Sequence, residues 1–553
     1  MYSNNKNVEQ LVSLLKAHQV HHAVLSSGSR NSPIIHSLAR DPSFTCHTVV
    51  DERSAGFYAL GIAQCTGETV AVCCTSGTAA LNYAPAVAEA YYQQLPLIVI
   101  TADRPAAWIG QMAGQTLPQP GIFNSLVKKS VHLPQIASAE DEWHCNRLLN
   151  EAILAASRRP PRPVHINIPL SEPLSEPAAA PEVRKISYSR PPVSSFGNYG
   201  ERFLKYRKRM IIAGQSREPA LSQALNDLVA MHDCVALAEH LSQIPSALLI
   251  HNFDALLYAL TATEWPQYAP DLLITVEGHI VSKRIRQFLR DNPPAQHWHI
   301  SPGGEVVDTY QCLTDVVEAD GVDFITYLAA QKPENLGDKS FSAQWLAPSL
   351  CMPEPDVAFS DLKAVGALLK ALPPDVNLHL ANSSSVRLAQ LFRPAGCPRI
   401  FSNRGTSGID GCLSTAVGGS CVSRKLTFLL IGDLAFFYDM NVLWNRPLKP
   451  NLRILLNNNQ GGEIFHSLPS SGNSAVIDKY IAVRHTTTAK AWAEDQGFTY
   501  LSVSNDSELQ TLMPAFTATH STRPILMEVF SSKERNVEIL RNYYTSLKTG
   551  TGK

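Results

Sequence analysis

The 553-residue sequence has no excess of charge of either sign. Its 47 Lys and Arg residues nearly balance its 48 Asp and Glu residues, and the formal net charge is −1. This balance gives no electrostatic attraction to nucleic acid or to an anionic membrane. No stretch reaches the ~18 consecutive apolar residues of a membrane-spanning helix, and the first twenty residues lack the basic start and unbroken apolar core of a signal peptide. We therefore expect a cytoplasmic protein without nucleic-acid or membrane partners.

Two common motifs are also missing. The sequence has eleven cysteines but no CxxC pair, which favours free and mostly buried thiols over a disulfide framework. It has no Walker A sequence, so a bound diphosphate would be held mainly through a metal ion and loop N–H groups.

What is present is a strong α/β pattern. Hydrophobic residues make up 45% of the chain and charged residues 17%, which suffices for several buried cores. Near-continuous apolar runs separated by helical patterns predict parallel strands joined by helices. The strands expected on this ground cover residues 21–26, 69–77, 96–105, 164–169, 209–214, 271–278, 295–301, 376–385, 426–434, 452–462 and 524–530.

Proline-rich segments predict where the domains end. One linker is expected over 171–200 and a second boundary in the Pro-containing stretch 346–356. We therefore predict three doubly wound parallel-sheet α/β domains, over residues 1–180, 181–355 and 356–553. The first and third have the appearance of two versions of one plan, and one helix is expected over 78–94 in the first.

Two polar groups follow neighbouring predicted strands of the third domain. Asp433 ends one strand and Asn459 follows the next, 26 residues later. Ligands of open α/β sheets bind beyond the carboxyl ends of the strands, and a carboxylate, an amide oxygen and a backbone carbonyl near Gly461 suit Mg²⁺. Either segment alone would be interpreted as an ordinary turn, but the ordered pair at this spacing favours a metal site.

Glu52 and four arginines also lie where a predicted strand ends or a predicted helix begins. Glu52 precedes a helix of small residues, where an exposed acid favoured by the helix dipole is the simpler interpretation. The arginines lie in polar loops after predicted strands, and Arg is suited to bidentate carboxylate recognition. Surface ion pairs would explain any one of them, but less easily all four: Arg30, Arg104, Arg387 and Arg404.

These segments together resemble a known family. The pair GDL and NNNQGG resembles the metal and diphosphate fingerprint of thiamin-diphosphate enzymes, with Leu434 where most relatives carry Gly, and DERSAGFYALGIA resembles their cofactor-activating glutamate segment. More narrowly, the chain resembles the SEPHCHC synthase (MenD) family of menaquinone biosynthesis. The segments that carry this resemblance are SGSRNSP, DERSAGFYALGIA, TSGTA, TADRP, QPGIF, SNRGTSGIDG, GDLAFFYD and NNNQGGEIF.

The resemblance implies thiamin diphosphate and Mg²⁺, with Mn²⁺ as a substitute. Asp433, Asn459 and the Gly461 carbonyl would bind the metal ion. Glu52 would hydrogen-bond the aminopyrimidine ring, a role that needs a desolvated carboxyl with a raised pKa. Ile409 would hold the cofactor in its bent form. The other cofactor-binding positions implied are Ser407, Gly408, Gly432, Leu434, Ile464 and Phe465.

The resemblance also implies the substrates 2-oxoglutarate and isochorismate, each with two carboxylates. The enzyme would decarboxylate 2-oxoglutarate on the cofactor and add the remaining four-carbon unit to isochorismate, as a transferase of class EC 2.2.1.9. Ser29, Arg30, Arg104 and Lys283 would bind the substrates. The implied catalytic residues besides Glu52 are Gln115, Ser383, Arg387 and Arg404.

Two alternatives differ from this prediction. Another thiamin-diphosphate decarboxylase or carboligase, such as an acetohydroxyacid synthase, would process pyruvate, which lacks the second carboxylate that the loop arginines suit. A regulatory metabolite-binding protein of the same fold would have lost Glu52 or the metal residues, and all are present.

Glu52 and Asp433 lie 381 residues apart on different predicted domains, yet both would touch one cofactor. The resemblance implies that the second domain comes from another subunit. We therefore expect a homodimer or homotetramer with shared active sites.

Overall fold

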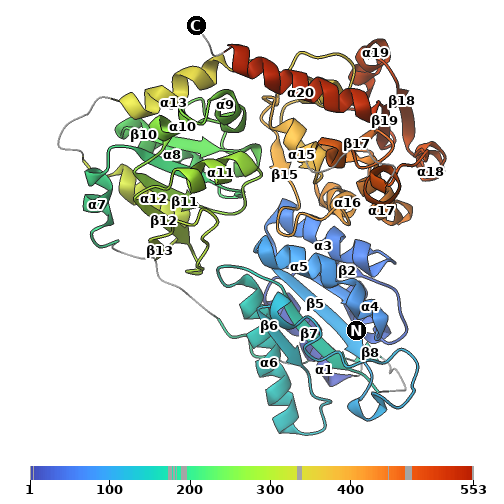
Figure 1. Cartoon of the computed structure of the whole chain (residues 1–553). Coiled ribbons are helices and arrows are strands. Elements are labelled where there is room, and N and C mark those ends of the chain that lie inside the picture. The colour runs from blue at the N-terminus through green and yellow to red at the C-terminus, as the bar shows by residue number, and fades with distance from the viewer. Residues whose placement is uncertain are drawn as a thin grey trace.

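The chain forms three lobes, each built on a parallel sheet, in a computed structural model (Figure 1). The structure describes residues 2–3, 5–171, 177–178, 181, 183–187, 196–332, 339–445, 447–467 and 476–550. The predicted α/β class is confirmed. The predicted domain limits at 180 and 355 stay predictions.

The first sheet has the strand order β3-β2-β4-β5-β7-β6 and is parallel throughout. Its strands are β2 (His22–Leu25), β3 (Thr45–Thr48), β4 (Val70–Cys74), β5 (Leu97–Asp103), β6 (Lys129–His132) and β7 (Val164–Pro169). Its helices are α1 (Lys6–Ala17), α2 (Ser32–Arg40), α3 (Glu52–Thr66), α4 (Thr78–Asn82), α5 (Ala84–Tyr92) and α6 (Ala139–Ser157). Two short strands, β1 (Tyr2–Ser3) and β8 (Pro177–Ala178), pair antiparallel outside this sheet.

The third sheet repeats this plan, with the order β15-β14-β16-β17-β19-β18. Counted from its own first strand, each outer sheet therefore runs 2-1-3-4-6-5. The strands are β14 (Asn377–Leu380), β15 (Arg399–Phe401), β16 (Thr427–Gly432), β17 (Leu452–Asn458), β18 (Thr499–Val503) and β19 (Ile525–Phe530). The helices are α14 (Asp361–Ala371), α15 (Ser384–Ala389), α16 (Cys412–Val422), α17 (Asp433–Asp439), α18 (Lys490–Asp495), α19 (Asp506–Phe516) and α20 (Lys533–Gly550).

The middle sheet has five parallel strands in the order β10-β9-β11-β12-β13. They are β9 (Arg209–Ala213), β10 (Cys234–Ala238), β11 (Leu272–Val276), β12 (Gln296–Ser301) and β13 (Asp315–Glu318). The helices around it are α7 (Tyr199–Lys205), α8 (Ala220–Met231), α9 (Phe253–Ala259), α10 (Trp265–Tyr268), α11 (Lys283–Asp291), α12 (Gly321–Ala329) and α13 (Ser340–Cys351). The C-terminal helix α20 packs against α9, which ties the third domain to the middle one (Figure 1).

The two outer domains meet where α3 packs against α16. This contact needs small residues because the backbones nearly touch: a Cβ atom on Gly61 would lie 1.9 Å from the Thr415 carbonyl oxygen, and one on Gly418 would lie 2.1 Å from that of Tyr58. The helices share one apolar core that runs from the first sheet into the third. This close packing fixes the N-terminus of α3, where Glu52 lies, against the third domain.

The structure corrects several details of the sequence-based prediction. The expected helix over 78–94 is divided into α4 and α5 at Tyr83, two residues before Pro85, because a proline breaks the helical hydrogen-bond pattern. The first part of the Pro-containing stretch 346–356 is helical, because α13 extends to Cys351 and carries Pro348, and the boundary expected there stays a prediction. In addition, all six edge strands of the three sheets were absent from the prediction.

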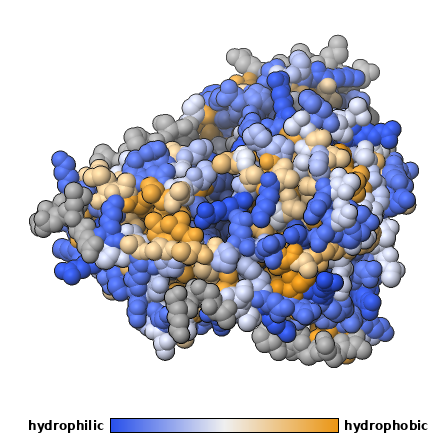
Figure 2. Space-filling model, turned by 90° about the horizontal axis from the view of Figure 1, so that it is seen from above, coloured by the Kyte–Doolittle hydropathy of each residue, from blue (hydrophilic) through white to orange (hydrophobic). Residues whose placement is uncertain are grey.

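The surface shows no continuous hydrophobic zone on the face seen from above, where hydrophobic residues form separate patches among hydrophilic ones (Figure 2). None of the helices in the described part of the chain is both long and apolar enough to cross a membrane. All eleven cysteines are unpaired, as predicted, and five of them are buried.

Candidate active site

Asp433 and Asn459 lie at the carboxyl ends of the neighbouring strands β16 and β17, as the sequence predicted. Asp433 is 3% exposed, and its Oδ2 accepts a hydrogen bond of 2.9 Å from the Gly461 backbone N–H. Burial raises the pKa of the Asp433 carboxyl. His485, which the sequence analysis did not single out, places its Nε2 3.2 Å from the same oxygen.

Asn459 has one amide atom that the protein leaves without a partner. Its Nδ2 donates to Asp361 Oδ2 and Glu463 Oε2, whereas its Oδ1 is buried and has no hydrogen-bond partner among the described residues. A buried oxygen without a donor is costly, so this atom fits a role as a ligand to a cation. The described residues contain no group of three or more His, Cys, Asp or Glu side chains suited to a metal. The predicted ligand set would not count as such a group, because two of its three ligands are an amide oxygen and a backbone carbonyl.

The loop after β15 carries Arg404 and the predicted cofactor residues Ser407, Gly408 and Ile409. Asn382 binds both ends of this loop: its Nδ2 donates to the carbonyl oxygens of Asn403 and Gly408, and its Oδ1 accepts from Arg404 at 2.7 Å. Ser407 has a positive φ of 63°, and Ser383, beside Asn382, has one of 68°. Such strain in residues other than glycine is frequent at functional sites.

Glu89, on α5 of the first domain, fixes the same loop from the other side. Its carboxylate is 1% exposed and accepts hydrogen bonds from the backbone N–H groups of Gly405 and Thr406 at 2.7 and 2.6 Å, and from the Thr406 hydroxyl at 2.6 Å. The sequence analysis missed Glu89, although an acid within an otherwise apolar helix was a signal. Glu89 therefore links the first domain to the loop of the third domain that carries the predicted cofactor residues.

We expect Glu89→Ala to lower the affinity for thiamin diphosphate by about one to two orders of magnitude, because two buried N–H groups would lose their acceptor at roughly 1–3 kcal/mol each. Calorimetric titration of the purified variant measures this. Glu140→Gln, an exposed acid on α6, is the matched control. An unchanged affinity in a folded Glu89→Ala protein would contradict this role of the residue.

Arg387 and Arg404 of the third domain and Arg286, on α11 of the middle domain, form a cationic group. Burial lowers the pKa of the Arg404 guanidinium, and the charge of nearby Arg387 lowers it further. Burial and the charge of Arg286 likewise lower the pKa of the Arg387 guanidinium. Glu239 and Glu89 partly offset this effect at Arg404, and Asp254 does so at Arg387. Burial raises the pKa of Glu239 to about 7. Because three guanidiniums repel one another here, a bound carboxylate would stabilise them.

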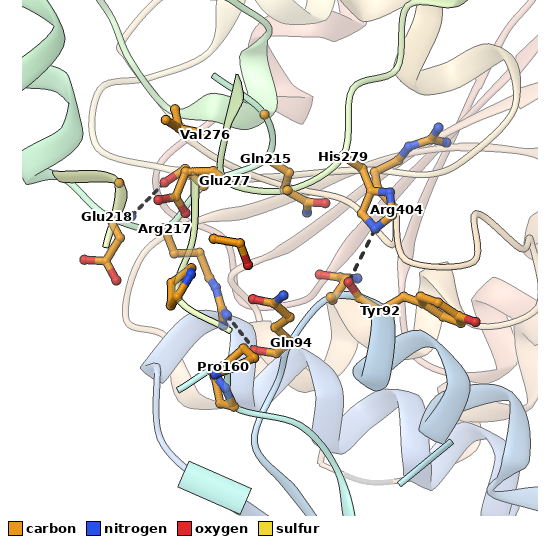
Figure 3. A pocket seen from close by; sticks show the side chains of 18 of the residues that line it. Tyr92, Gln94, Pro160, Gln215, Arg217, Glu218, Val276, Glu277, His279 and Arg404 are labelled. Carbon is orange, nitrogen blue, oxygen red and sulfur yellow. Dashed lines mark hydrogen bonds between the residues drawn. The ribbon is translucent and has the colours of Figure 1, made fainter. Parts of the chain in front are cut away.

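Two cavities adjoin this group. One of about 240 Å³ is lined by Arg387 and by Lys283, the first residue of α11, so the structure brings this predicted pair together. The other, of about 1380 Å³, lies where the three domains meet, and Arg404 and Ser407 line it. In Figure 3, first-domain residues face middle-domain residues across it: Arg217 donates to the Gln94 carbonyl oxygen at 3.2 Å, and His279 Nε2 lies 3.4 Å from that of Tyr92.

The first-domain candidates gather at the carboxyl edge of the first sheet. Arg30 is 5% exposed and donates to the Leu170 carbonyl oxygen at 2.9 Å, and Arg104, after β5, has a buried Nε without a hydrogen-bond partner among the described residues. Gln115 is exposed and in a left-handed conformation, with φ 57°; its Cα would lie 3.2 Å from a Cβ atom on Gly77, after β4. Ser29 is exposed in the loop before α2.

Gln119 connects segments at the carboxyl edge of the first sheet. The sequence analysis did not single it out, although the motif QPGIF contains it. It is fully buried, accepts a hydrogen bond of 2.8 Å from the Gly77 backbone N–H, and donates to Asn167 at 2.9 Å. The loop with Gln115 is thereby attached to the strand ends.

Glu52 begins α3, whose N-cap is Asp51. Burial raises the pKa of the Glu52 carboxyl, in the direction the predicted role requires. Its neighbour Arg53 donates to the Tyr438 carbonyl oxygen at 2.7 Å, and Asp51 accepts from Asn441. No described hydrogen bond joins Glu52 itself to Asp433 or Asn459.

The paired sheets and the Asp–Asn–Gly edge of the third define a thiamin diphosphate-dependent enzyme. The family model described as "Thiamine pyrophosphate enzyme, N-terminal TPP binding domain" matches residues 6–123, and the one described as "Middle domain of thiamine pyrophosphate" matches residues 198–380. Within this class, the chain belongs to the family of the 2-succinyl-5-enolpyruvyl-6-hydroxy-3-cyclohexene-1-carboxylate synthases.

Relatives of that name align over the full length. The chain is 50% identical to the synthase of Bacteroides thetaiotaomicron, with 99% of this chain and 100% of the relative covered. It is 48% identical to that of Phocaeicola vulgatus, with 99% of each covered. It is 36% identical to that of Porphyromonas gingivalis, with 98% and 97% covered.

Proposed function

We propose that this protein is a 2-succinyl-5-enolpyruvyl-6-hydroxy-3-cyclohexene-1-carboxylate synthase, which decarboxylates 2-oxoglutarate and adds the remaining four-carbon unit to isochorismate in menaquinone biosynthesis. The observation that carries the proposal is the 50% identity over 559 aligned residues with a synthase of that name. The cationic group of half-buried Arg286 and Arg387 and buried Arg404 supports it, because both substrates carry two carboxylates.

Thiamin diphosphate, when bound, would supply a thiazolium ring with an acidic carbon that can act as a nucleophile and a positively charged nitrogen that can accept the electron pair released by decarboxylation. In the proposal, Glu52 holds a proton toward the aminopyrimidine ring. Its half-buried carboxyl suits this role, because burial raises its pKa and favours the protonated form. Ile409 supports the bent form of the cofactor, and Ile464 and Phe465, which lie in the short helix Glu463–Ser467, pack beside it.

Mg²⁺, or Mn²⁺ in its place, is proposed to bind Asp433, Asn459 and the Gly461 carbonyl. The unpartnered, buried Asn459 Oδ1 supports this assignment. Gly461 adopts φ 143°, and a Cβ atom there would lie 2.7 Å from the Ala482 carbonyl oxygen, so the loop requires glycine at this point. Gly432 and Leu434 flank Asp433 at the N-terminus of α17, beside the proposed diphosphate site.

The substrates are proposed to bind through their carboxylates. Arg387, Arg404 and Lys283 on the third and middle domains hold carboxylates remote from the reacting carbon, with Ser383 beside them. Ser29, Arg30, Arg104 and Gln115 contribute from the first sheet's edge. Fixing two charged ends of each substrate orients the reacting carbons, which reduces the entropic cost of bringing the two substrates together.

The proposal includes a homodimer or homotetramer in the cytoplasm. The oligomer is proposed from the family resemblance. The cytoplasmic location is supported by the eleven cysteines, which are all unpaired, as in a reducing compartment.

The test incubates the protein with thiamin diphosphate, Mg²⁺ and isochorismate, with 2-oxoglutarate in one sample and pyruvate in another. Isochorismate loss and CO₂ release are followed. Turnover with 2-oxoglutarate alone is expected. Turnover with pyruvate would agree with the assigned cofactor but refute 2-oxoglutarate as the substrate. No turnover in either sample would favour a regulatory protein.

We expect Arg387→Ala to raise the KM for a dicarboxylate substrate by about 10- to 100-fold, in line with the ~1.5–3 kcal/mol of a charge-assisted hydrogen bond, and to leave cofactor affinity nearly unchanged. Initial rates and cofactor titration separate the two quantities. Arg40→Ala, an exposed arginine at the end of α2, is the control. If substrate binding and cofactor affinity weaken equally in Arg387→Ala, Arg387 has a structural role instead.

A further inference from the structure

Two buried carboxylates hold the side chain of Asn459. Its Nδ2 donates to Asp361 Oδ2 at 2.9 Å and to Glu463 Oε2 at 2.8 Å. Asp361 is 2% exposed and begins α14, and Glu463 is 7% exposed and begins the short helix after the NNNQGG segment. Neither acid is assigned a role in the proposed reaction.

This arrangement determines which way the amide faces. An amide nitrogen has two hydrogens, and here each has its own carboxylate acceptor. Turning the amide over would place Oδ1 against two acceptor oxygens, which is repulsive. Oδ1 must therefore face the other side, where it is buried and has no described hydrogen-bond partner.

The two carboxylates are themselves held in place. Asp361 Oδ1 accepts from the Ser531 hydroxyl at 2.6 Å, and its backbone N–H donates to Asn536 Oδ1 at 3.1 Å. Asn536, on α20, also donates through Nδ2 to Glu463 Oε2 at 2.8 Å. The network thus joins α14, the end of β19, α20 and the loop after β17.

We propose that Asp361 and Glu463 are positioning residues that fix the amide orientation of Asn459, so that its Oδ1 faces the divalent ion. This inference rests on the proposed metal site. It adds that the ligand's direction is set by two acids that do not themselves bind the ion, as outer partners commonly do for metal ligands.

The cost of the arrangement supports a functional role. Asp361 and Glu463 are both buried, and both accept from the same amide group. Two neighbouring acids in an apolar interior destabilise a fold, whereas an apolar pair would not. A requirement for two acceptors at Asn459 Nδ2 gives a reason for keeping them.

The experiment measures Mn²⁺ affinity by electron paramagnetic resonance on the full-length protein with thiamin diphosphate. Glu463→Ala is expected to weaken Mn²⁺ binding about 10- to 100-fold. Glu463→Gln is expected to restore wild-type affinity, because its amide oxygen can accept the same hydrogen bonds. Asp356→Ala, which removes an exposed acid that pairs with Lys363 outside this network, is the control and is expected to bind Mn²⁺ like the wild type.

Asn459→Asp gives a second, independent measurement if Glu463→Ala fails to fold. An aspartate is ordinarily a good ligand for Mn²⁺, but here it would face two acids, so weaker binding is expected. Asn459→Asp combined with Glu463→Gln should regain affinity, because the glutamine amide can donate to the new carboxylate.

Asn459→Ala separates failure of this inference from failure of the metal site. If Asn459→Ala binds Mn²⁺ like the wild type, the proposed metal site is wrong. If Asn459→Ala binds weakly but a folded Glu463→Ala binds normally, or Asn459→Asp binds as tightly as the wild type, the positioning role is overturned.

Discussion

Glu52→Gln is expected to bind thiamin diphosphate and to lose exchange of the C2 proton by about 10²- to 10⁴-fold, the usual contribution of a proton-transfer group. Glutamine keeps the size of the side chain and can form a hydrogen bond, but it has no acidic proton to hold or move. Burial raises the pKa of the native carboxyl, the direction that a proton-holding role requires. Hydrogen–deuterium exchange at C2, followed by NMR on the quenched complex, measures the effect directly.

The control for this substitution is Glu68→Gln, which alters an exposed acid just beyond the end of α3. It should exchange at the wild-type rate. Exchange at that rate in Glu52→Gln with cofactor bound would show that another group performs this step, and the assignment of Glu52 would have to be withdrawn.

Asp433→Ala is expected to weaken Mg²⁺-dependent binding of thiamin diphosphate on the order of 100-fold or more, since loss of an outer partner alone commonly costs about 10- to 100-fold. Asp433 supplies the negative charge of the proposed ligand set. Its carboxylate also holds the loop, through the Gly461 N–H at 2.9 Å and the Leu434 N–H at 2.6 Å. Calorimetric titration of cofactor, with and without Mg²⁺, measures the loss.

Asp433→Asn separates the two contributions, because it retains an oxygen acceptor for the loop while removing the charge. We expect it to keep the thermal stability of the apo-protein and still lose Mg²⁺-dependent affinity. Asp356→Ala, which alters a highly exposed acid paired with Lys363, is the control. Wild-type cofactor affinity in both Asp433 variants would exclude this residue as a metal ligand.

The interior strands were predictable because they are buried on both faces. In each sheet the strands inside were recognised from continuous apolar runs, such as β16 and β17, whereas the strands at both edges were missed. Most edge strands, such as β3 (TCHT) and β6 (KSVH), are partly exposed and carry mixed polarity, so they lack that pattern. The edge strand β10 (CVALA) is buried and apolar and was overlooked although it has the pattern. The repetition of one strand order in the two outer sheets became visible only with the edges in place.

The residues of the site can also be divided into those that local sequence patterns predict and those that they do not. Asp433 and Asn459 were predictable because each directly follows an apolar strand, and parallel neighbouring strands bring their carboxyl ends together. Glu89 and Asp361 were not predictable. Glu89 lies 316 residues from Gly405, and Asp361 lies 98 residues from Asn459, so no local spacing relates either acid to its partner.

The sequence by itself determined the α/β class, the cofactor fingerprint and the residues that bear charge, because these depend on local patterns of apolar and polar side chains. The tertiary structure alone decided which buried acids hold the catalytic loops, and which way the Asn459 amide faces. Those choices arise from packing between segments distant in the chain, where a buried polar atom must find a partner that only the folded arrangement provides.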